Sequence, residues 1–166
     1  MVLQAIERVN RGLGRVAAYC AIVMMLAQVF SVVARYVFSF GIIAVQETVV
    51  YGHALIFLLG AAFVLQENAH VRVDVFYEAM GERTRRIVNL IGLLFFVLPV
   101  AWVVLWYSYP YVVRSWSTFE GSRQSGGLPA VCLLKSAVWI FGASLILQVV
   151  GTGARITKGE SWEQER

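Results

Sequence analysis

The sequence predicts an all-α integral membrane protein with four transmembrane helices. Four long apolar stretches take up most of its 166 residues, at 16–38, 44–65, 87–113 and 128–150. A helix needs ~20 mainly apolar residues to cross a bilayer core, and each stretch is long enough. Hydrophobic residues make up 59% of the chain and charged residues 14%, below the ~25% charged of soluble domains. Residues 1–166 are therefore expected to form a single four-helix membrane domain.

The first stretch is expected to be a retained membrane span. Arg8, Arg11 and Arg15 precede it, as basic residues precede the core of a secretion signal. Its apolar run is longer than the roughly 7–15 residues of a signal core, however, and three further stretches follow. These observations favour a span that stays in the membrane.

The third stretch predicts an irregular helix with an aromatic end. From Ile87 to Val113 a straight helix would be ~40 Å long at 1.5 Å per residue, longer than the hydrocarbon is thick. Pro99, near its middle, lacks a backbone donor and predicts a kink. Six aromatic residues follow: Trp102, Trp106, Tyr107, Tyr109, Tyr111 and Trp116. They predict an aromatic belt at the membrane interface, and a platform that binds a sugar or a quinone is the less favoured interpretation.

The connection between the second and third stretches predicts a short amphipathic helix over 73–82, lying at the inner membrane surface. Val73, Phe76, Tyr77 and Met80 follow the i, i+3, i+4, i+7 spacing of one helical face. Arginines come next, at 83, 85 and 86, and can reach anionic lipid headgroups.

The distribution of Lys and Arg predicts that both termini are cytoplasmic. With the N-terminus inside, the inner segments hold ten basic residues: Arg8, Arg11, Arg15, Arg72, Arg83, Arg85, Arg86, Arg155, Lys158 and Arg166. The outer side has four: Arg35, Arg114, Arg123 and Lys135. Cytoplasmic segments of membrane proteins carry this excess. The basic residues sit at span ends and form no basic face, so the net charge of +4 does not indicate a nucleic-acid partner.

Polar residues inside the spans are few. Gln28 and Ser31 lie in the first, and Gln46, Glu47 and His53 lie in the outer half of the second. Glu47 suggests either an ion site or a hydrogen bond or salt bridge to another helix or a second protein. The second reading is favoured, because one peripheral carboxylate makes a poor ion cage.

No cofactor, metal site or catalytic site is expected. His53 and His70 are predicted at different depths, so one haem cannot bridge them. The Cys and His residues lack a ligand-like spacing, and no catalytic triad, Walker loop or dinucleotide fingerprint appears.

The outer connection Ser115–Pro129 is rich in Ser, Gly and Pro and predicts a turn-rich loop. Glu120 and Arg123 either pair locally or present charge to a partner.

Several short motifs, taken in order, resemble the small membrane subunit (DctQ/SiaQ type) of tripartite ATP-independent periplasmic (TRAP) transporters. They are Arg35-Tyr36-Val37-Phe38 closing the first span, Gln46-Glu47 opening the second, Gly60-Ala61-Ala62 with His70, Arg72 and Asp74 after it, and Glu120, Ser122, Arg123, Leu128, Pro129 and Lys135 leading into the fourth. The resemblance covers nearly the whole chain.

This resemblance implies a scaffold subunit of the bacterial inner membrane. Its partners would be a large multi-span subunit, which moves an organic acid with sodium, and a periplasmic substrate-binding protein. Two alternatives remain, a self-sufficient four-span exporter and a membrane redox subunit. The exporter would need a carboxylate in the substrate path, and Glu47 is the one candidate.

Overall fold

The computed structural model describes residues 2–67 and 80–157, and these residues form helices joined by short loops. The elements are α1 (Val2–Val37), α2 (Ile43–Gln66), α4 (Glu82–Gly92), the π-helical turn η1 (Leu93–Val97), α5 (Leu98–Ser117) and α6 (Val131–Thr157). Because α4, η1 and α5 follow one another without a break, the described residues contain four helices long and apolar enough to span a membrane. The predicted all-helical, four-span fold is confirmed.

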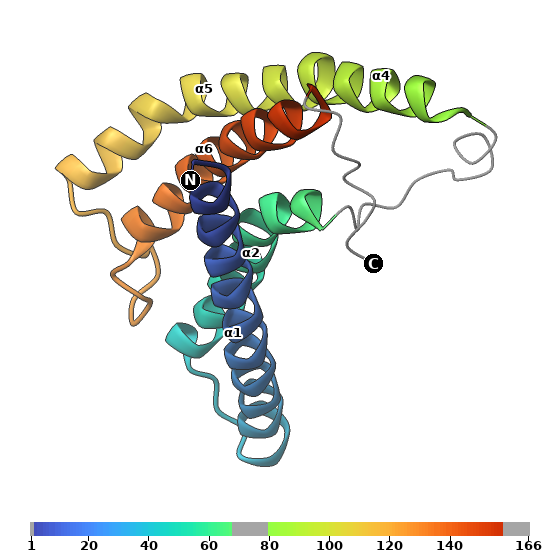
Figure 1. Ribbon diagram of the computed structural model, residues 1–166. Helices are drawn as coiled ribbons and strands as arrows, with labels where there is room; N and C mark the ends of the chain where they lie inside the picture. The colour runs from blue at the N-terminus through green and yellow to red at the C-terminus, as the bar shows by residue number, and fades with distance from the viewer. Residues whose placement is uncertain (1, 68–79, 158–166) are drawn as a thin grey trace.

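Two helical hairpins make up the bundle (Figure 1). α1 packs against α2, α5 packs against α6, and α6 joins the hairpins through its contact with α2. Glycines allow close approach within each hairpin. A Cβ atom added to Gly52 in α2 would lie 2.9 Å from Cβ of Met24 in α1, and one added to Gly142 in α6 would lie 2.7 Å from Cγ of Leu105 in α5. Small residues at such points let membrane helices pack backbone to backbone.

α6 is the central helix of the fold. Its Leu145, Val149 and Ile156 belong to the buried core, together with Ala62 and Leu65 of α2. In the most hydrophobic part of each span, 33% of the residues of α6 are buried, compared with only 6% of those of α1. Most of the apolar surface of α1 therefore faces outward, toward lipid or another protein.

The first helix is longer than the predicted span, since it begins at Val2. Hydropathy detects only the part that suits hydrocarbon, whereas the helix continues into a preceding amphipathic segment. In that segment Ile6 and Asn10 are buried, while Arg8, Arg11 and Arg15 are exposed.

The irregularity predicted at Pro99 appears as the π-helical turn η1, directly before the proline. A proline ring would clash with the carbonyl four residues earlier, that of Phe95, and a widened turn relieves such a clash. The long helix α4–η1–α5 then follows a curved path along α6 (Figure 1). The predicted interfacial helix over 73–82 lies mostly outside the described residues; Met80 and Gly81 are not helical, and α4 begins at Glu82.

Candidate functional site

Glu47, in the first turns of α2, holds the loop that leads into α6. The Ser122 hydroxyl donates a hydrogen bond to Oε1 of Glu47, and the backbone N–H of Leu128 donates to Oε2 at 2.6 Å. A Cβ atom on Gly127 would lie 2.7 Å from Oε2, so only glycine fits beside the carboxylate without a shift. One side chain of the second span thus fixes both arms of the loop 118–130.

Glu120, in the same loop, binds Lys135 in the second turn of α6. The Lys135 ammonium donates to Oε2 of Glu120 and lies 3.8 Å from the ring centroid of Tyr111. This hydrogen bond is the main cause that lowers the pKa of Glu120. The ion pair of Glu120 is with Lys135, which reaches back from the helix to the carboxylate. The exposed Arg123, considered as a local partner of Glu120, also lowers the pKa of that carboxyl through its charge, but to a lesser degree.

The remaining predicted site residues stand apart from these contacts. Arg35 is exposed in the last turn of α1, Pro129 is exposed just before α6, and Gln46 is partly buried at the start of α2. His70, Arg72 and Asp74 lie outside the described residues. The structure therefore brings together Glu47, Ser122 and Leu128, and separately Glu120 and Lys135.

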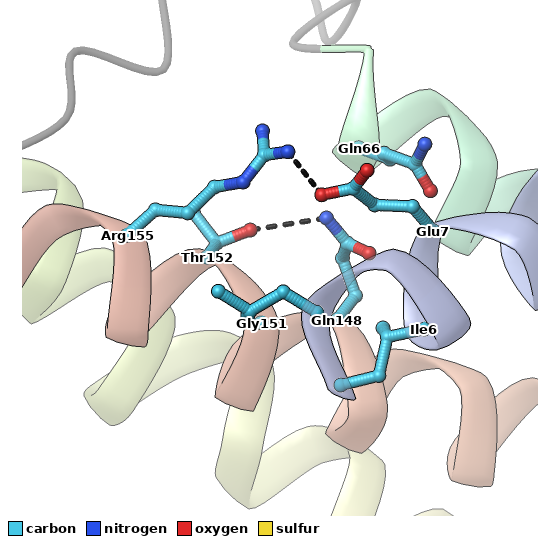
Figure 2. A pocket seen from close by; sticks show the side chains of 8 residues that line it. Ile6, Glu7, Gln66, Gln148, Gly151, Thr152 and Arg155 are labelled. Carbon is cyan, nitrogen blue, oxygen red and sulfur yellow. Dashed lines mark hydrogen bonds and ion pairs between the residues drawn. The ribbon is translucent and has the colours of Figure 1, made fainter. Parts of the chain in front are cut away.

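A second polar cluster, which sequence reasoning missed, joins α1 to α6 at the opposite end of the bundle (Figure 2). Asn10 of α1 is fully buried and donates through Nδ2 to Oε1 of Gln148 in α6, at 2.6 Å. Gln148 in turn donates through Nε2 to the Thr152 hydroxyl at 3.0 Å. One turn further along, the Arg155 guanidinium forms an ion pair with Glu7.

A small cavity of about 10 Å³ lies in this cluster, and Gln66 at the end of α2 completes its wall. A cavity of this size has room for about one water molecule. The carbonyl oxygens of the Gln66 and Asn10 side chains are buried and have no hydrogen-bond partner among the described residues. The cluster is therefore a compact polar joint between three helices.

The helical spacing of polar residues was the available signal for this cluster. Gln148, Thr152 and Arg155 follow one another at i, i+4 and i+7, and Glu7 and Asn10 at i, i+3, so each set lies on one face of its helix. Asn10 and Gln148 are 138 positions apart, and nothing in their spacing pairs them.

The predicted aromatic belt forms part of the contact between α5 and α6. The indole N–H of Trp116 donates to the Ser136 hydroxyl at 2.7 Å, and that of Trp139 donates to the Leu105 carbonyl at 3.3 Å. An open groove beside these contacts is lined almost entirely by apolar groups: Trp102, Leu105, Trp106, Tyr109, Pro110 and Trp139. Indole rings whose N–H is hydrogen-bonded and whose carbon face is exposed suit the membrane interface.

Glu47, Glu120, Asn10 and Gln148 all bind other groups of the same chain, as expected of residues that hold helices together. Comparison with known proteins assigns the chain to a family. The family profile described as tripartite ATP-independent periplasmic transporters, DctQ component, matches residues 17–159, which include nearly all of the four spanning helices. A search among curated proteins finds no match. The chain belongs to the DctQ family, the small membrane subunits that work with a large membrane subunit and a binding protein in TRAP transporters.

Proposed function

We propose that this chain is a scaffold that packs against and stabilises the large membrane subunit, and does not itself carry substrate or ion. The transporter would import an organic acid, such as a dicarboxylate or sugar acid, with sodium across the bacterial inner membrane. The observation that carries this proposal is the use of Glu47: each of its oxygens accepts a hydrogen bond from the loop 118–130. A carboxylate whose two oxygens accept hydrogen bonds in this way stabilises the fold and is poorly suited to bind an ion that must move past it.

The two polar clusters support a topology with both termini on one side of the membrane. Glu7, near the start of α1, pairs with Arg155, near the end of α6, so these two helix ends lie together. Glu47, Ser122 and Leu128 mark the other end of the bundle. The end that contains Glu7 also carries Arg8, Arg11 and Arg15, and the positive-inside rule favours the cytoplasmic side for this end.

The outward-facing apolar surface supports a subunit role. α1 and the helix α4–η1–α5 expose many large apolar side chains, whereas α2 and α6 are covered more fully by the rest of the described chain. Lipid covers part of such a surface, and a second membrane protein that packs on the rest would gain van der Waals contacts along whole helices.

Reconstitution of defined components tests the proposal. Proteoliposomes containing this chain, the large subunit encoded with it, or both, are supplied with the binding protein and a labelled organic acid, in sodium or choline buffer. Uptake is expected only with both membrane subunits and sodium, and the two subunits should co-purify. Uptake by this chain alone would refute the scaffold role.

The same assay separates the exporter alternative. Glu47→Gln should reduce the yield of the complex and the uptake in parallel, because its effect is on folding. If uptake falls while complex yield and loop structure remain intact, Glu47 takes part in ion or substrate movement and the scaffold role fails.

A further inference from the structure

We propose that the large membrane subunit binds the face of α1 centred on Gln28. This face, called the Gln28 face, consists of Ala21, Met25, Gln28, Val32 and Arg35. The inference rests on the proposed scaffold function and adds the location of the contact.

The depth of Gln28 provides the first argument. Gln28 lies one position from the centre of the predicted span 16–38, and its side chain is exposed. Within residues 2–67 and 80–157 its amide has no hydrogen-bond partner. Such an amide has two N–H donors and a carbonyl acceptor, and a bilayer core offers water to none of them. Because an unpaired polar group in hydrocarbon is costly, the side chain requires a polar partner on another protein.

The neighbours of Gln28 suit a contact between helices. Each residue turns an α-helix by 100°, so positions 21, 25, 28, 32 and 35 fall on one side of α1. α2 packs on an adjacent side, where Met24 meets Gly52. The Gln28 face combines a small residue, Ala21, with the flexible Met25 and the polar Gln28. Small and polar residues are enriched where membrane helices meet, and methionine adapts its shape to a partner.

The opposite side of α1 has a different composition. Its residues are exposed and bulky, and all but the tyrosine are purely apolar: Tyr19, Val23, Leu26, Phe30, Val33 and Val37. Lipid acyl chains cover such a surface without leaving a polar group unpaired. At the same depth, α1 thus has one apolar side that suits contact with lipid and another side whose Gln28 amide finds no hydrogen-bond partner in lipid.

The occupant follows from the family and from the outer end of the face. DctQ subunits work with a large membrane subunit, so a membrane protein is present at the right depth. Arg35 lies two turns from Gln28 on the same side, exposed in the last turn of α1, and offers a charged contact where the partner emerges from the bilayer. A second copy of this chain is the competing occupant and is an outcome of the test below.

Site-specific photocrosslinking tests the location. The photoreactive residue p-benzoylphenylalanine replaces Gln28 in one variant and Leu26 or Phe30 in matched controls at the same depth on the opposite side. Each variant is co-expressed with a tagged large subunit and irradiated in native membranes. The adduct with the large subunit is expected from position 28 and not from positions 26 and 30.

Three results would overturn the inference: an adduct from position 26 or 30 in place of 28, an adduct from 28 to a second copy of this chain, or no adduct from 28. Co-purification of the unmodified subunits, measured in parallel, separates these failures from a failure of the scaffold proposal. If the unmodified subunits do not associate, both ideas are refuted.

Substitution of the amide gives an independent measurement. Gln28→Leu should weaken association with the large subunit about 3- to 30-fold, the range expected for an interhelical hydrogen bond in a membrane. The melting temperature of the isolated chain should not fall, because the side chain is exposed. Gln28→Asn should retain part of the affinity, and Leu26→Met should leave it unchanged. Unaltered association of Gln28→Leu would contradict the inference.

Discussion

Glu47 holds the loop 118–130 at two points, so its replacement measures how far this loop depends on one carboxylate. Glu47→Gln leaves one carbonyl oxygen for two donors, the Ser122 hydroxyl and the Leu128 N–H. A hydrogen bond to a charged group contributes about 1.5–3 kcal/mol, and a neutral one about 1 kcal/mol. We expect the free energy of loop opening to fall by about 2 kcal/mol, from the loss of one charged bond and the weakening of the other.

Hydrogen exchange at the Leu128 amide is the assay, because this N–H is itself a partner of Glu47. A loss of about 2 kcal/mol corresponds to exchange about 30-fold faster in the variant. Ser122→Ala should have a smaller effect, and the double variant should show less than the sum, since both changes act on one contact. Ser125→Ala, in an exposed part of the same loop, is the control. Equal exchange at Leu128 in Glu47→Gln and the parent chain would refute the reasoning.

Three further predictions concern the joints of the bundle. Gly142→Ala should lower the melting temperature, by a loss of about 1–3 kcal/mol from overpacking against Leu105, whereas Gly153→Ala in the same helix meets no atom within 4 Å and should not; equal melting temperatures would argue against close packing of α5 on α6. Asn10→Leu should destabilise the chain by about 1–3 kcal/mol, because it leaves the buried Gln148 carbonyl without a donor; thermal unfolding with Gln4→Leu, at an exposed position, as the control measures this. The Glu120–Lys135 contact should weaken in acid. Because the pKa of Glu120 is lowered in the fold, this carboxylate contributes stability above its unfolded pKa, and that stability is lost as the pH falls through the lowered value. The difference in melting temperature between the parent chain and Glu120→Gln should therefore shrink on acidification, and a constant difference would contradict this.

The sequence alone predicts the spans well where hydropathy and helix coincide. The second stretch, predicted over 44–65, is the helix Ile43–Gln66, because the apolar run and the helix begin and end at nearly the same residues. The start of α1 at Val2 was not predicted, since its first turns are amphipathic and add nothing to a hydropathy sum. The fourth helix likewise runs on to Thr157, beyond the predicted 150.

Long-range partners could not be predicted from spacing. Glu47 and Ser122 are 75 positions apart, and their contact depends on how α6 crosses α2. Both residues belong to motifs singled out by resemblance, which marks positions but gives no contacts. Lys135 was also singled out, yet its pairing with Glu120 required the geometry of the helix start. Sequence reasoning thus found the residues of the Glu47 and Glu120 contacts and missed those of the cluster around Asn10 and Gln148.

The placement of the polar contacts explains how so small a bundle keeps its shape. Lipid tails are as apolar as leucine, so helices in a membrane gain little from burying apolar surface against one another. This chain ties α6 to its neighbours near both ends instead, through Glu47 and Leu128 at one end and through Asn10 and Gln148 at the other. Two separated ties fix both the position and the crossing of a helix, where one tie would leave it free to pivot. These contacts lie near the two ends of the bundle, whereas Gln28 near the middle of α1 makes no hydrogen bond within residues 2–67 and 80–157, which is why its amide is the one proposed to meet a partner.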